Sequence, residues 1–155
     1  MKNLTSLLIS SLLVFSAAAC QNPPKTSETA PNATNVAATA PDKEETQAAK
    51  QDAQSETRRR QLNSDIRARE QRNNNFNNGE ATDRAARDIA SEVRSKLEAN
   101  IPNGQLTVDA SKDGTVTVVG TVPVADQLKK IDPLTREIKG VKNVIVKATV
   151  APPKS

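Results

Sequence analysis

The sequence predicts a small α+β domain of order αββαβ in the C-terminal half of the chain, behind a long polar N-terminal region. Three observations carry this fold class. Apolar residues recur at helical spacing over 85–97 and 128–138, and they alternate at strand spacing over 106–110 and 115–119. A third, β-branched run follows at 141–150. We therefore expect two helices packed on one face of a three-stranded mixed sheet, preceded by a disordered tether.

The first helix of this domain is predicted to begin near Thr82. Apolar residues at i, i+4 spacing from Ala85 to Leu97 place one apolar stripe on the helix. Thr82 is a suitable N-cap, and Asp83 puts a negative charge in the first turn, where it suits the helix dipole. The run Asn-Ile-Pro-Asn-Gly at 100–104 is expected to end the helix.

Two strands are predicted on either side of Lys112-Asp113-Gly114. Because Asp-Gly favours tight turns, this stretch indicates a hairpin. After the second strand, Gly120 is expected to let the chain leave the hairpin at a backbone angle that is closed to other residues.

A second helix is predicted over 128–138, with Pro133 inside it. A proline at this place either kinks the helix or starts a new helical segment capped by Asp132. Gly140 is expected to stop the helix in the left-handed conformation. Since the strand at 141–150 then arrives through a helical crossover, we expect it to run parallel to one of the first two strands.

Residues 20–51 are predicted to be a disordered tether. They are rich in proline, alanine, threonine and charged residues, and Val36 is their only large apolar residue. Such a segment cannot bury enough apolar surface to offset its chain entropy.

Residues 52–80 are predicted to be a basic, partly helical spacer with an asparagine-rich hinge at 73–79. Six arginines lie between positions 58 and 72, but Leu62 and Ile66 form the only apolar i, i+4 pair, a stripe too thin to dock firmly. Two interpretations stay open. The segment is a basic helix on anionic phospholipid or a polyanionic wall polymer, or it is a solvated spacer.

Cys20 is the only cysteine, and the chain has no histidine. An internal disulfide, a histidine-activated thiol and a Cys/His metal site therefore lack partner residues. Cys20 follows a positive start and an uncharged run at 4–19, which is too short for a comfortable membrane span and typical of a secretory signal. Residues 1–19 are therefore predicted to be a signal peptide.

The stretch Ala17-Ala18-Ala19-Cys20 resembles the end of a bacterial lipoprotein signal. The resemblance implies that Cys20 is the lipid attachment residue, that it becomes the new N-terminus, and that the protein is anchored to a bacterial membrane facing the periplasm. Gln21 stands where inner-membrane lipoproteins often carry aspartate, which favours the outer membrane. Cleavage by an ordinary signal peptidase after Ala-x-Ala is the competing interpretation.

The composition gives no sign of catalysis. The acidic residues are scattered among basic ones, and no Gly-rich phosphate loop is present. The formal net charge is +4, but Phe76 is the only aromatic residue after position 19, so stacking platforms for nucleic acid are missing. We expect a non-enzymatic protein without a cofactor, a metal or a nucleic-acid partner.

Residues 81–151 resemble a BON domain, the module named for bacterial osmotically inducible and nodulation-associated proteins. The likeness lies in DIASEVRSKLEA (88–99), LTVDASKDGTVTVVGTV (106–122) and EIKGVKNVIVKATV (137–150). It implies association with phospholipid membrane and support of envelope integrity or osmotic-stress tolerance. The alternative is a periplasmic module that binds envelope proteins through an exposed sheet edge. Candidate head-group contacts are the basic residues around the second helix: Lys129, Lys130, Arg136, Lys139 and Lys142.

Overall fold

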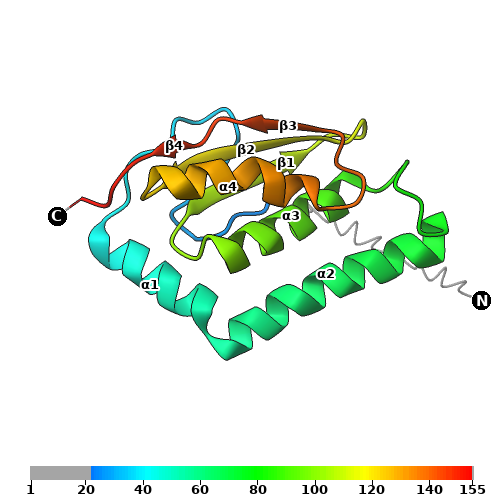
Figure 1. The fold of residues 1–155 in the computed structure, drawn as a ribbon, viewed down its shortest axis with the longest axis horizontal. Coiled ribbons are helices and arrows are strands. Elements are labelled where there is room, and N and C mark those ends of the chain that lie inside the picture. Colours follow the sequence, from blue (N-terminus) through cyan, green and yellow to red (C-terminus); the bar gives the residue numbers. More distant parts are fainter. Residues whose placement is uncertain (1–21, 155) are drawn as a thin grey trace, which may run out of the picture.

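The computed structural model describes residues 22–154, and the prediction for Cys20 lies outside them. The described chain forms an α+β fold with a mixed, four-stranded sheet (Figure 1). The helices are α1 (Lys43–Gln54), α2 (Glu56–Asn77), α3 (Ala86–Asn100) and α4 (Ala125–Arg136), and the strands are β1 (Gln105–Ala110), β2 (Thr115–Val122), β3 (Asn143–Val146) and β4 (Thr149–Val150). None of the described helices is long and apolar enough to cross a membrane.

The sheet is built around β2. β1 and β2 form the predicted antiparallel hairpin, with Val108 opposite Val118 and Gly114 at φ +83° in the turn. β3 and β4 both run parallel to β2, which confirms the parallel return through a helical crossover. The third strand, expected to be continuous, is divided into β3 and β4, which pair with β2 before and after Gly120, a residue at φ +130°.

The core lies between the sheet and the two helices α3 and α4, which cover the same face (Figure 1). Each large apolar side chain fully buried there contributes about 1.5–3 kcal/mol. The fully buried core residues include Val93, Leu97, Leu106, Val118 and Ile131.

Both helices differ in detail from expectation. α3 begins at Ala86 rather than near Thr82, because Asp83, expected in the first turn, adopts the left-handed conformation at φ +58°. α4 is one continuous helix through Pro133, so the proline starts no new segment. Pro133 has no N–H, so the Lys129 carbonyl has no hydrogen-bond donor within the helix. Lys129 is exposed, and solvent can supply that donor.

The prediction of a disordered tether is wrong for the described part of residues 20–51. Residues 43–51 belong to α1, and Lys25 forms an antiparallel bridge with Thr107 on the outer edge of β1. The polar composition misled the prediction, because the segment is held by backbone hydrogen bonds to an open strand edge rather than by apolar burial.

The prediction of an asparagine-rich hinge at 73–79 is also wrong, because α2 continues to Asn77. Asn73 and Asn77 donate side-chain amide hydrogens to the Glu80 carbonyl, and Asn77 also donates to that of Thr82. These bonds fix the turn that follows the helix. The helix ends at Asn78, which adopts the left-handed conformation at φ +49°.

Candidate functional site

α2 is fixed on α3 by arginine–carboxylate pairs, and Leu62 of its thin apolar stripe is buried at 1% exposure. Asp88 of α3 accepts hydrogen bonds from Arg69 Nη1 at 2.9 Å and Arg72 Nη1 at 2.8 Å, and its side chain is 8% exposed. At the other end of α3, Glu98 accepts from Arg58 Nε at 2.5 Å and from Arg58 Nη2 at 3.0 Å. Such charge-assisted bonds are stronger than neutral ones.

A third contact lies in the middle of the same interface. Asp65 of α2 accepts from the buried Ser95 hydroxyl at 2.9 Å and from Arg69 at 3.1 Å. The arginines Arg58, Arg69 and Arg72 therefore serve an internal interface, and the prediction that the stripe was too thin to dock is wrong. Arg59 and Arg67 remain exposed on the outer side of α2.

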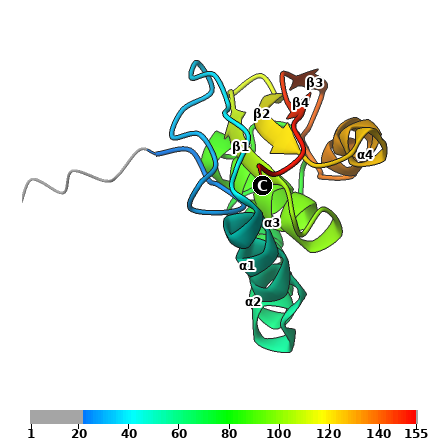
Figure 2. The same ribbon diagram turned by 90° about the vertical axis from the view of Figure 1, so that its left-hand side faces the viewer.

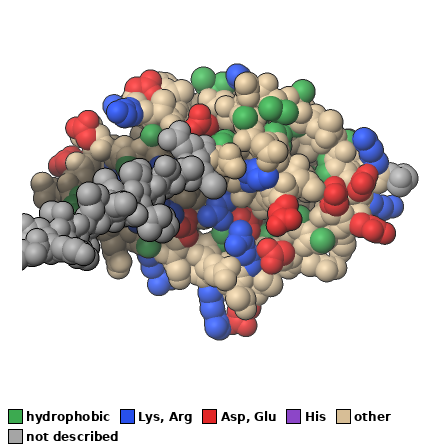
Figure 3. Space-filling view, turned by 180° about the vertical axis from the view of Figure 1, so that it is seen from behind, with side chains coloured by type: hydrophobic (Ala, Val, Ile, Leu, Met, Phe, Trp, Pro, Cys, Tyr) green, Lys and Arg blue, Asp and Glu red, His purple; other side chains and the backbone are tan. Residues whose placement is uncertain are grey.

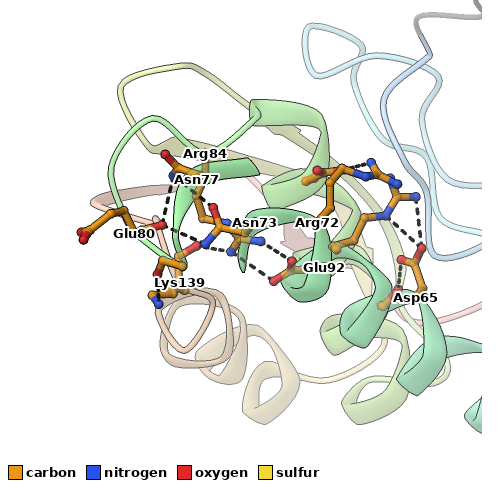
Figure 4. Close-up of polar contacts among 12 residues, drawn as sticks. Asp65, Arg72, Asn73, Asn77, Glu80, Arg84, Glu92 and Lys139 are labelled. Carbon is orange, nitrogen blue, oxygen red and sulfur yellow. Dashed lines mark hydrogen bonds and ion pairs between the residues drawn. The ribbon is translucent and has the colours of Figure 1, made fainter. Parts of the chain in front are cut away.

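A buried ion pair links three segments of the domain (Figure 4). The Arg84 and Glu92 side chains are each 1% exposed and form a two-pronged pair. Arg84 Nη1 also donates to the Lys139 carbonyl at 2.6 Å, just beyond α4. Burial raises the pKa of Glu92, although the paired guanidinium opposes this shift. Arg84 and Glu92 are eight positions apart in sequence, so the i, i+3 and i, i+4 spacings of helical ion pairs do not predict this contact.

The two glycines singled out from the sequence lie where a side chain is obstructed. A Cβ on Gly120 would lie 1.9 Å from the Gln105 carbonyl oxygen, at φ +130°. Gly140 has φ +95°, and a Cβ there would lie 3.1 Å from both the Ala81 carbonyl and Arg84 Cδ. Gly140 follows the end of α4 by four residues, so the helix stops earlier than predicted. Both glycines serve backbone packing.

The five candidate head-group residues do not form one free basic patch. Lys129 pairs with Asp126 at 3.1 Å, and Arg136 pairs with Asp132 at 2.7 Å. The remaining three are exposed; Lys139 Nζ donates to the Gly79 carbonyl, whereas no ion pair involves Lys130 or Lys142 among residues 22–154. On the face opposite α4, acidic and basic side chains are likewise interspersed (Figure 3).

β3 leaves one edge of the sheet open. The backbone N–H groups of Asn143 and Lys147 point toward β2, where they donate to the Gly114 and Val118 carbonyls. Because successive N–H groups of a strand point to opposite sides, those of Val144 and Val146 point outward, away from β2. No other strand of the described chain pairs with this edge. It is a ready template for a partner strand.

A hollow of about 990 Å³ lies between the N-terminal segment and α1. Its walls carry charges of both signs, including Lys25, Glu28, Glu45 and Arg58. In residues 22–154, no group of three or more His, Cys, Asp or Glu side chains is arranged to hold a metal ion. The hollow has neither the apolar lining of a typical small-molecule site nor a nucleophile–base pair.

The fold and these surfaces define a small α+β binding module with an open strand edge and charged helices. Residues 85–152, from the start of α3 through β4, match the model of the BON domain family, so this part of the chain is a BON domain. Domains of this family are non-catalytic and bind phospholipid or membranes, or mediate interactions. No curated protein and no solved structure matches the chain. α1, α2 and the N-terminal segment lie outside the matched region.

Proposed function

We propose that this protein is a non-enzymatic cell-envelope lipoprotein whose BON domain associates with a phospholipid membrane and supports envelope integrity under osmotic stress. The observation that carries the proposal is a BON domain at 85–152 placed behind a signal-like segment that ends at Cys20. A membrane-binding domain gains from such an anchor, because tethering raises its effective concentration at the bilayer. The proposed location is the periplasmic side of a bacterial membrane, with the outer membrane favoured by Gln21.

The anchor is tested by expressing the full chain in a bacterium and determining the mass of its mature N-terminal peptide. We expect a chain that begins at Cys20 and carries a diacylglyceryl group on Sγ, and we expect it to enter the detergent phase on phase separation. Cys20→Ala is the matched control and should stay unacylated. A mature chain that begins elsewhere and enters the aqueous phase would refute the anchor.

Membrane association by the protein surface is tested separately with residues 22–155, which lack the anchor. Exposed basic residues near an anionic surface each contribute about 1 kcal/mol to binding. We therefore expect salt-sensitive binding to phosphatidylglycerol vesicles that Lys142→Gln weakens more than Arg136→Gln, since Arg136 is already paired with Asp132. Binding that is absent at low salt would leave the acyl anchor as the sole membrane contact.

A second candidate function is a protein-interaction module, and the open edge of β3 favours it. The Val144 N–H points away from β2, so Val144→Pro removes an outward donor without breaking the β2 ladder. If a partner adds a strand here, Val144→Pro abolishes a stoichiometric complex while thermal stability changes little. A complex that survives Val144→Pro would exclude this edge.

A further inference from the structure

The segment before α1 pairs with the outer edge of β1 through an isolated antiparallel bridge between Lys25 and Thr107. Thr26 N donates to the Leu106 carbonyl at 2.8 Å, and Val108 N donates to the Pro24 carbonyl at 2.9 Å. The Thr26 hydroxyl adds two bonds, accepting from Leu106 N and donating to the Gly104 carbonyl, both at 2.9 Å. Docking therefore satisfies the edge groups that β1 would otherwise expose.

The direction of this segment along β1 follows from its pairing. Because Lys25 pairs antiparallel with Thr107, residues before Pro24 run toward the hairpin end of β1. Cys20 precedes Pro24 by four residues, which span at most about 14 Å when extended. Figure 2 shows the described N-terminal segment beside β1, on the side of the sheet away from α4.

Three elements meet at the hairpin end, defined here as the hairpin turn, the turn after α4 and the C-terminus of α2. Lys142 N donates to the Gly114 carbonyl at 2.8 Å, which joins the hairpin turn to the chain after α4. Lys139 Nζ donates to the Gly79 carbonyl, which joins that chain to the end of α2 (Figure 1). Phe76, at the C-terminus of α2, is 87% exposed.

We propose that the hairpin end is the surface that contacts the phospholipid bilayer while the N-terminal segment is docked, with Phe76 entering the headgroup region. The inference rests on the proposed acylation of Cys20, since the short segment from Cys20 to Pro24 would hold the hairpin end close to the bilayer. Lys112, Lys139 and Lys142 add positive charge, which Asp113 and Glu80 offset in part. The exposed ring and the short segment from Cys20 to Pro24 specify this contact, and the small excess of positive charge adds to it.

The same geometry turns the opposite end of the molecule away from the membrane. Val124 precedes α4 at the far end of β2 from the hairpin turn, and it is 51% exposed. Lys129 and Lys130 lie in the N-terminal half of α4, so the docked state separates them from the hairpin end. Two exposed apolar residues thus mark opposite ends of one molecule and form a matched pair of probe positions.

The test uses the chain's lack of tryptophan. Phe76→Trp and Val124→Trp are prepared separately in the acylated full-length protein and reconstituted in phosphatidylethanolamine–phosphatidylglycerol vesicles with brominated acyl chains, which quench nearby indole emission. We expect the emission of Phe76→Trp to be quenched several-fold more strongly than that of Val124→Trp. Equal quenching of the two probes would overturn the inference.

Two further variants connect the result to the docked segment. Thr26→Pro removes the N–H and hydroxyl that bind β1, so we expect it to lower the quenching of Phe76→Trp to the level of Val124→Trp. Lys25→Cys with Thr107→Cys joins a non-hydrogen-bonded antiparallel pair, a geometry that accepts a disulfide. This lock should retain the full difference between the probes, and its loss in the locked protein would contradict the inference.

The two proposals fail in distinguishable ways. Mass determination of the reconstituted protein reports whether Cys20 carries its acyl chains before any emission is measured. A protein without acyl chains overturns the proposed anchor together with this inference. Unequal quenching with Thr26→Pro unchanged from the parent overturns the role of the docked segment, and equal quenching in the acylated protein overturns the inference alone.

Discussion

Gly120 lies in β2 between the stretch that pairs with β3 and the stretch that pairs with β4. Its φ of +130° and the close approach of the Gln105 carbonyl leave no room for a side chain. β2 pairs with β3 before this glycine and with β4 after it, in the same register.

Gly120→Ala is therefore expected to destabilise the domain. Its Cβ must displace the Gln105 backbone in a conformation that L residues avoid, and such strain costs on the order of 1–3 kcal/mol before any repacking. Urea unfolding followed by circular dichroism measures the change. Gly104→Ala is the control, because Gly104 has no positive φ and the added Cβ comes no closer than 3.0 Å, to Ile101 Cγ2, against 1.9 Å at Gly120. Equal losses in the two variants would contradict the backbone argument.

Arg84 is the second residue on which the fold depends. Arg84→Met leaves Glu92 buried without its cation and removes the bond to the Lys139 carbonyl. Breaking one side of a buried pair costs about 3–5 kcal/mol. We expect a loss of this size at neutral pH, and the double variant Arg84→Met/Glu92→Leu should recover most of it because neither charge then remains buried. A double variant no more stable than Arg84→Met would argue against this account.

The raised pKa of Glu92 sets the direction of a pH dependence. A carboxyl whose pKa is higher in the folded state than its ordinary value of 4.5 binds its proton more tightly when folded. Its contribution to stability is therefore fully present below pH 4.5 and is lost as the pH rises through the folded pKa. Relative to Glu92→Gln, the wild type should lose stability over this window. Denaturant midpoints measured across pH check the sign, and a rising difference would refute it.

At the scale of elements, α2 is a polar helix that docks through charge. It carries Arg58, Asp65 and Arg69, which meet polar side chains of α3, and Leu62 is its one buried apolar side chain. A buried carboxylate that accepts several hydrogen bonds binds arginine strongly, whereas a fully solvated ion pair contributes little to stability. The low exposure of Asp88 and Glu98 places the interface nearer the first case.

Asp88→Asn should loosen α2 without unfolding the core. The substitution removes the charge that accepts hydrogen bonds from both Arg69 and Arg72, and hydrogen bonds to charged groups contribute about 1.5–3 kcal/mol each. We expect faster hydrogen exchange along α2 and unchanged protection of β2 amides. Arg67→Ala, on the exposed side of α2, is the control and should leave both rates unchanged. Equal exchange in α2 and β2 would show that α2 and the core unfold together.

The elements of the BON domain were predictable from the sequence because their apolar periodicity records burial. The stripe from Ala85 to Leu97, the alternation around Val108 and Val118, and the Asp-Gly turn each correspond to an observed helix, strand or turn. Periodicity did not reveal the docking of α2 or of Pro24–Thr26. Charge pairs and backbone bonds between segments far apart in sequence hold these elements, and neither leaves a local pattern.

At the scale of the whole molecule, the chain adds two polar layers to a small domain. α2 covers α3, and the N-terminal segment covers the β1 edge and continues over the sheet, where the Thr107 hydroxyl donates to the Pro31 carbonyl. A domain of about 70 residues buries a modest fraction of its surface and has little stability to spare. The additions complete hydrogen bonds at an edge that would otherwise remain open.

A fragment of residues 82–155 is therefore expected to be less stable than residues 22–155 and to self-associate. Without the N-terminal segment, β1 presents unpaired backbone groups beside Thr107, which is fully buried in the longer chain. Sedimentation velocity over a range of concentrations measures association, and thermal unfolding measures stability. Thr107→Lys places a charge on the uncovered edge, so this variant of the fragment should be monomeric. A fragment that is monomeric without Thr107→Lys and unfolds at the same temperature as residues 22–155 would show that the BON domain closes its own edge, and the N-terminal segment would then have no structural reason to stay docked.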